Sequence, residues 1–341
     1  METIKIVRPS RKIACLLGAA VVLATAAALW WVRHTNTQDS ISTTRMSGRP
    51  AHAARSLAKA EAPTTIPGRP EKTISFSGNA SVPAGMERIH LAVNSDHNTG
   101  FPERVAVVHA LRTELTAAEV SAFYGYLRTS TSKSGQDTEG EHWLRNEMMD
   151  KLVQQATMPP GLSDMLVAVY HDPAQDVVMR DYSVQHMAPA YEKVSDQEKS
   201  NLRDALWQAA GETDTSIAGT AILAMLDIAQ TEPTMDRGRL ADTAFKLAAD
   251  DRCGELARIT AVQVCGRMGV EQALPIVEQL AQTAQSIPLR IAATAALGDI
   301  GGTEAVQILQ RLAESSEPRQ ALAAQSALHR AQSASVKQAK R

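Results

Sequence analysis

The chain has 341 residues and a formal net charge of -2, and only 4% of its residues are aromatic. Scarce aromatics and abundant alanine suit close helix packing and argue against a strand-built sandwich, because strands favour β-branched and aromatic side chains. The charge is uneven, since residues 101–329 hold 19 Lys and Arg against 31 Asp and Glu. An excess of negative charge repels phosphate backbones, which argues against nucleic acid as the main partner.

The amino terminus predicts a membrane anchor. Residues 1–12 carry four Lys and Arg, and residues 13–32, IACLLGAAVVLATAAALWWV, contain no charged side chain. About twenty apolar residues are enough for a helix to cross the hydrocarbon core of a bilayer. Trp30 and Trp31 end the run, where indoles prefer the lipid–water interface. We expect a single-pass protein of a bacterial inner membrane, with residues 1–12 in the cytoplasm, a transmembrane helix at 13–32 and the repeat domain in the periplasm.

The same segment is compatible with a cleavable signal peptide, because small residues at 26–28 follow an apolar stretch. The tryptophan pair close after that point favours the uncleaved anchor. Cleavage would instead release a secreted periplasmic binding module. Both interpretations export the rest of the chain across the membrane.

Residues 33–100 predict a flexible linker. They are rich in Thr, Ser, Ala and Pro, mix both charges and lack sustained apolar periodicity. Such a segment cannot bury enough apolar surface to offset the entropy lost on ordering. Within it, residues 86–93 are compatible with a helical turn.

The same two-helix unit stands twice in the second half of the chain, at 258–281 and 290–313, and the copies are 32 positions apart. Gly266 of the first copy recurs as Gly298 of the second. In both copies apolar residues stand at i, i+3, i+4 and i+7 of the first helix, which is one helical face. A helical repeat of this length indicates an α-solenoid, where each helix pair buries its apolar face against its neighbours.

Weaker copies extend the array. First helices of the same kind are predicted in five further segments: 102–111, 141–155, 172–187, 215–229 and 317–331. Together they make seven first helices in a repeat domain at 101–332, followed by a basic tail at 333–341. Capping boxes at Thr116–Glu119 and Ser195–Glu198 predict the starts of second helices, because each end of such a box supplies hydrogen-bond partners for the other.

This pattern resembles the HEAT-repeat family, especially the short HEAT-like subtype of the phycobilin lyases. The resemblance rests on the Asp-Pro entry and later arginine of Asp172–Arg180, and on the Arg-x-x-Ala-x-x-x-Leu-Gly-x-Ile-Gly run of Arg290–Gly301. It is closest over 253–331, extends over 102–252 and is absent from 1–100. It implies an all-α fold, a right-handed α-solenoid of about seven HEAT-like helix pairs.

In that family an aspartate and an arginine tend to form a hydrogen-bonded ladder between repeats. The resemblance therefore implies a structural role for Asp172, Arg180, Arg258, Arg290 and Arg319. The helix at 215–229 has no arginine at this position, so we expect the ladder to be interrupted there.

The larger aromatic side chains of the array have two interpretations. They pack in the core and caps, or, where exposed, they anchor a partner, because aromatic residues dominate interface hot spots. The candidate anchors are Tyr124, Tyr126, Trp143 and Trp207.

The residues give no sign of a catalytic or metal centre. The chain has no His-Glu dipeptide of the kind used by the di-iron hydroxylases of this fold, no Gly-rich phosphate loop and no cysteine pairs at zinc spacing. The acidic stretch around His142 would offer ligands from one helix only, which is weak for a metal. Cys253 and Cys265 lie too far apart along a helix for a disulfide. We expect no catalytic residue, metal or cofactor.

These observations predict a membrane-tethered scaffold that binds unidentified protein partners on the extracytoplasmic side, with no nucleic acid and no small-molecule substrate. The linker would raise the effective concentration of the array for a partner at the same membrane. The competing hypothesis is a HEAT-like lyase or another cofactor-handling enzyme.

Overall fold

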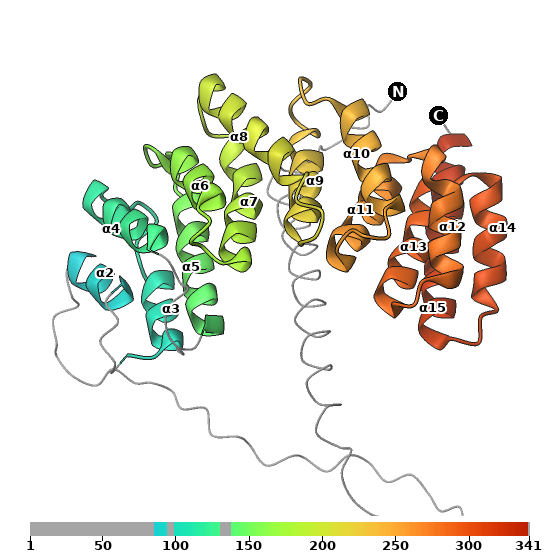
Figure 1. The fold of residues 1–341 in the computed structure, drawn as a ribbon, viewed down its shortest axis with the longest axis horizontal. Coiled ribbons are helices and arrows are strands. Elements are labelled where there is room, and N and C mark those ends of the chain that lie inside the picture. The colour runs from blue at the N-terminus through green and yellow to red at the C-terminus, as the bar shows by residue number, and fades with distance from the viewer. Residues whose placement is uncertain (1–84, 94–98, 130–137, 340–341) are drawn as a thin grey trace, which may run out of the picture. The chain divides into compact units, whose positions relative to one another are not determined.

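A computed structural model describes residues 85–93, 99–129 and 138–339, which contain α-helices, one short 3₁₀-helix at Glu271–Ala273 and no strand (Figure 1). The helices form two series that alternate along the chain. The first-helix layer consists of α3 (Phe101–His109), α5 (Thr138–Val153), α7 (Val177–Tyr191), α9 (Ile217–Ile228), α11 (Glu255–Met268), α13 (Ile287–Ile300) and α15 (Pro318–Ala339). The second-helix layer consists of α2 (Gly85–Val93), α4 (Ala117–Arg128), α6 (Leu162–His171), α8 (Asp196–Ala209), α10 (Arg237–Ala249), α12 (Leu274–Thr283) and α14 (Gly302–Ala313).

The packing is sequential. Each member of the first-helix layer packs against the next, from α3 to α15, and each second helix packs against the first helix that follows it. Helices therefore contact their neighbours in the series, as expected of a solenoid. The seven first helices predicted from the periodicity are all present in the described part of the chain.

Local sequence signals set several helix ends. Thr116 with Glu119 begins α4, and Ser195 with Glu198 begins α8, each pair forming the predicted capping box. Gly269 ends α11 with φ 64°, a left-handed conformation that glycine adopts without a steric penalty.

Glycines let the last first helices approach closely. A Cβ placed on Gly266 would lie 2.9 Å from Cα of Ala296, and one on Gly298 would lie 2.8 Å from Cβ of Ala327. The first contact joins α11 to α13 and the second joins α13 to α15. The glycines recur in the two sequence copies because the same close helix contact recurs.

Two predicted boundaries are wrong. Helix α2 lies inside the predicted linker, yet it packs against α3 and α4, and its Ile89 and Ala92 are fully buried. The packed array thus includes Gly85–Val93, because packing against distant helices is not encoded in a local pattern. Helix α15 continues to Ala339 through much of the predicted tail at 333–341, because no glycine or proline interrupts it there.

The predicted transmembrane helix at 13–32 and the linker up to residue 84 lie outside the described residues. Of the helices in the described ranges, none combines the length and the apolar character needed to cross a membrane.

We expect Gly298→Ala to destabilise the array by about 1–3 kcal/mol, although alanine is the better helix former by about 1 kcal/mol. The new methyl group would lie 2.9 Å from the Ala327 carbonyl oxygen, so α13 and α15 must move apart. The control is Gly125→Ala within α4, because nothing lies within 4 Å of a Cβ at that position. Urea unfolding should show a loss of stability for Gly298→Ala only. Equal stabilities of the two variants would contradict the close contact.

Candidate functional site

Arginines near the start of first helices donate hydrogen bonds to the end of the preceding second helix. The contacts are Arg104 Nε to Ala92 O at 2.8 Å, Arg180 Nε to Tyr170 O at 2.7 Å and Arg258 Nη2 to Ala248 O at 3.4 Å. The last carbonyls of a helix have no partner within it and carry the negative end of its dipole. Each of these arginines therefore ties a first helix to the helix before it.

The predicted aspartate–arginine ladder is not formed as expected, because its residues make other contacts. Asp172 accepts a hydrogen bond from the backbone N–H of Ala174 at 2.9 Å, so it shapes its own loop. Arg180 also contacts a carboxylate, since its Nη2 lies 2.5 Å from Oε1 of Glu212. Arg290 is the fourth residue of its helix, as Arg180 and Arg258 are of theirs, and its Nε is buried without a hydrogen-bond partner. The contacts of the arginines thus run mainly to main-chain carbonyls.

Arg319 lies out of register with the other predicted arginines. Ala327 meets Gly298 as Ala296 meets Gly266, which places Ala321 rather than Arg319 at the position of the arginines. Arg319 is exposed in the first turn of α15. The neighbouring Gln320 is buried, and its side-chain amide donates to the carbonyl oxygen of Ala281 in α12. A mismatch of two residues is easily missed here because residues 317–331 are a weak copy of the repeated unit.

Lysines that the sequence reasoning missed satisfy the ends of first helices. Lys151 Nζ donates to the carbonyl of Leu111 at 2.7 Å, and Lys193 Nζ donates to that of Val153 at 2.7 Å. Each lysine reaches the end of the preceding first helix, 40 residues earlier in the chain. The available signal was a basic residue at a helix end, where cations are favourable.

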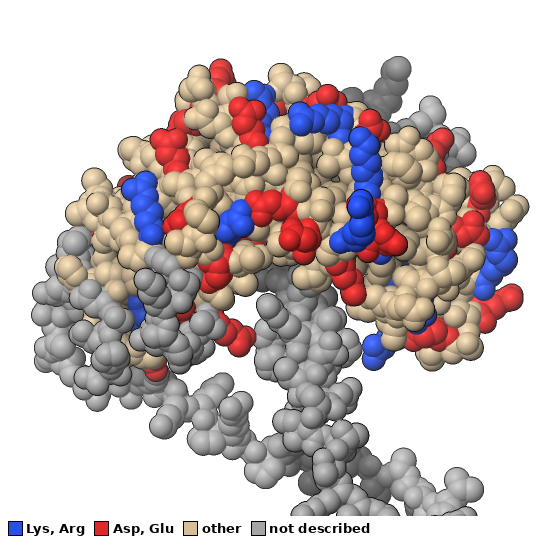
Figure 2. Space-filling model, in the orientation of Figure 1, with Lys and Arg blue, Asp and Glu red and all other residues tan. Residues whose placement is uncertain are grey.

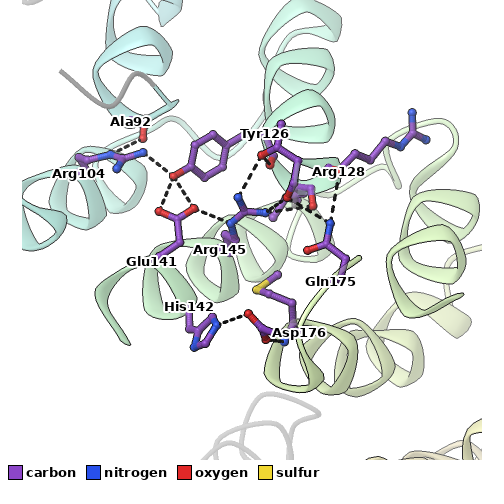
Figure 3. A network of polar contacts seen from close by, with 12 residues as sticks. Ala92, Arg104, Tyr126, Arg128, Glu141, His142, Arg145, Gln175 and Asp176 are labelled. Atoms are coloured by element: carbon purple, nitrogen blue, oxygen red, sulfur yellow. Dashed lines mark hydrogen bonds and ion pairs between the residues drawn. The ribbon is translucent and has the colours of Figure 1, made fainter. Parts of the chain in front are cut away.

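A largely buried polar network joins α3, α4 and α5 (Figure 3). The Tyr126 hydroxyl accepts from Arg104 Nη2 at 2.6 Å and donates to the Glu141 carboxylate, 2.8 Å from each oxygen. Glu141 accepts from Arg145 Nε at 2.6 Å, and Arg145 Nη1 donates to the Thr129 carbonyl at 2.8 Å. Burial, and then the Glu141 charge, raise the pKa of Tyr126 to about 12, so its hydroxyl keeps the proton that it donates.

The four candidate anchors are not equivalent. Tyr126 is held in the network, and the Tyr124 hydroxyl donates to the Pro160 carbonyl at 3.2 Å. Trp207 is partly buried, and the Arg239 guanidinium lies 3.9 Å from the centre of its ring system. Trp143 is 43% exposed. Of the four, it is the side chain most available to a partner.

Trp143 lies on the solvent-exposed side of α5, beside charged groups. Its indole Nε1 donates to Glu147 Oε1 at 3.2 Å, and Glu147 Oε2 lies 2.7 Å from Nε2 of His109 on α3. Asp150 follows on the same side of α5, where burial and then the Glu147 charge raise its pKa. Figure 2 shows Asp and Glu side chains spread along the array on the face in view, with Lys and Arg among them.

Two histidines lie where α5 meets α7. His142 Nε2 lies 2.6 Å from Asp176 Oδ2 (Figure 3), and His186 Nε2 lies 3.1 Å from Asn146 Oδ1. His186 is 3% exposed, and its burial lowers its pKa to about 4. It is therefore neutral at pH 7 and serves as a packing residue.

The cysteines and the possible metal ligands of the described ranges form no reactive centre. Cys253 and Cys265 are free and buried. In the same ranges, no three or more His, Cys, Asp and Glu residues lie together as metal ligands would.

We expect acid to destabilise the array through His186. Its unfolded pKa of 6.5 exceeds the folded value of about 4, so the unfolded chain binds the proton more readily. The contribution, up to roughly 3 kcal/mol, is complete above pH 6.5 and is lost as the pH falls toward 4. Thermal unfolding of His186→Gln should show a flatter pH profile over this range. His329→Gln, at an exposed residue of α15, is the control, and a profile unchanged in both variants would contradict this role.

Comparison with solved structures gives distant likenesses. Human deoxyhypusine hydroxylase in complex with glycerol aligns at 16% identity and TM-score 0.34, over 73% of this chain and 96% of that one. A designed armadillo repeat protein aligns at 16% and 0.37, over 72% and 98%. The complex of CpcE and CpcF of phycocyanin lyase from Nostoc sp. PCC7120 aligns at 15% and 0.38, over 75% and 97%.

Sequence comparison is more specific. No curated protein matches the sequence. A family model described as HEAT repeats matches residues 241–329, from α10 to α15. The chain therefore contains HEAT repeats over this segment, as the repeated unit predicted.

Proposed function

We propose that the protein is a membrane-tethered scaffold whose helical array binds protein partners on the extracytoplasmic side of a bacterial inner membrane. The observation that carries the proposal is that cationic side chains of the array bind the ends of neighbouring helices. Arg104, Arg145, Arg180, Lys151 and Lys193 all contact helix ends, and so hold the repeats together. A stacked array of this kind offers an extended surface, which is what repeat proteins use for binding.

The tether is proposed from the sequence. Residues 13–32 are uncharged and follow a basic segment at 1–12, the arrangement that favours a cytoplasmic amino terminus. Residues 33–84 separate that segment from α2. Confinement to the membrane surface would raise the effective concentration of the array for a partner in the same membrane, without any new contact.

The location is tested by fractionation and by a reporter enzyme that works only outside the cytoplasm, fused after Arg341. The full-length chain should stay with membranes washed in alkali, and the reporter should be active. An inactive reporter would contradict the proposed orientation. A chain released with a new amino terminus near Leu29 would mean that residues 1–28 are a signal peptide and that the protein is secreted.

The binding role is tested by cross-linking in native membranes, followed by purification of the full-length protein in detergent. We expect cross-linking in native membranes to capture discrete partners, and we expect no stoichiometric metal or chromophore in the purified protein. A stoichiometric cofactor would instead favour an enzyme, such as a lyase of the HEAT-like group.

A further inference from the structure

One side of α3 and α5 carries residues that are exposed or, in the case of Glu147 and Asp150, half-buried, and it is here called the α3–α5 face. On α5 its members stand at steps of four, four and three residues, which places them on one stripe of a helix. On α3 they stand three residues apart. The face consists of Glu103, Ala106, His109, Glu139, Trp143, Glu147 and Asp150.

The face is acidic because the cations of these two helices point elsewhere. The Lys and Arg residues of α3 and α5 are Arg104, Arg145 and Lys151, and all three donate to carbonyls at the ends of α2, α4 and α3. Four carboxylates therefore stand on the face, where His109 lies 2.7 Å from Glu147 and the neutral His186 of α7 lies 3.8 Å from Asp150. The pKa of Asp150 is raised first by burial and then by the Glu147 charge, while His109 lowers it.

Trp143 gives the face an aromatic centre. It is 43% exposed, and the hydrogen bond from its indole nitrogen to Glu147 holds the ring beside a carboxylate. An aromatic ring attracts Lys and Arg side chains through its quadrupole, and tryptophan does so best. A ring and a carboxylate held side by side thus suit a single cationic side chain, which would contact both.

We propose that the α3–α5 face binds a basic segment of a partner protein, with a Lys or Arg side chain on Trp143 and Glu147 and further cations along Glu139 and Asp150. This inference rests on the proposed scaffold function and supplies the chemistry of its partner. The same carboxylates repel phosphate groups, which disfavours nucleic acid and the headgroups of anionic lipids on this face.

The test measures fluorescence anisotropy of a labelled peptide of alternating arginine and alanine, with the full-length protein in detergent. The comparison peptide has glutamate in place of arginine. We expect the arginine peptide alone to bind, and we expect weaker binding at about 0.5 M than at about 0.05 M salt, because salt screens exposed charges.

Variants locate the binding. Trp143→Ala should weaken binding by about five- to thirtyfold. Glu139→Gln and Glu147→Gln should each weaken it by about three- to tenfold and reduce its salt dependence. Glu139 is exposed, so its variant removes charge without disturbing the contacts of Glu147. The controls are Trp207→Ala in α8 and Glu304→Gln in the first turn of α14.

Equal affinities of the Trp143 and Trp207 variants, or equal binding of both peptides, would overturn the proposal. Cross-linking in native membranes separates this failure from that of the scaffold function. If Trp143→Ala captures the same partners as the wild type, the scaffold stands and this face is not its binding surface. If the wild type captures none, both proposals fail.

Discussion

An α-helix ends in carbonyl oxygens that no group within the helix can reach, and the rest of this structure depends on how they are satisfied. Side chains from the following helices supply the donors: Arg104 and Arg180 at the ends of second helices, and Lys151 and Lys193 at the ends of first helices. Each contact joins neighbouring elements. Separating two repeats would exchange each of these bonds for bonds to water, at a net cost of roughly 1.5–3 kcal/mol for a charged donor.

Neighbouring helices are held together by different contacts at the two ends of the array. From α3 to α7 long polar side chains bridge the helices, as in the network around Tyr126. From α11 to α15 the helices approach closely through Gly266 and Gly298. The HEAT family match covers 241–329, which includes the second arrangement. Short, glycine-marked repeats preserve a recognisable spacing, whereas bridges built from varied long side chains leave a weaker trace in the sequence.

Periodicity predicted the seven first helices, and residue chemistry predicted both capping boxes, because these features depend on near neighbours in the chain. Residues 86–93 were predicted as a helical turn within a linker, because no local pattern encodes the packing of α2 against α3 and α4. The role of Glu141 depends on Tyr126, fifteen residues away, and on packing that no local pattern encodes. Likewise, all four candidate anchors are aromatic, and only the fold shows that Trp143 is the exposed one.

The central claim is that the buried polar groups of this array are structural, and that partners meet its open faces instead. It is tested most directly by Tyr126→Phe, which keeps the ring but removes the hydroxyl between Arg104 and Glu141. Tyr124→Phe is the control, because that hydroxyl makes only longer contacts, of 3.2 and 3.4 Å, to carbonyls. Segment-resolved hydrogen exchange should show about 1–3 kcal/mol less protection in α3 to α5 for Tyr126→Phe, with partner capture retained. Unchanged protection together with lost partner capture would contradict the claim.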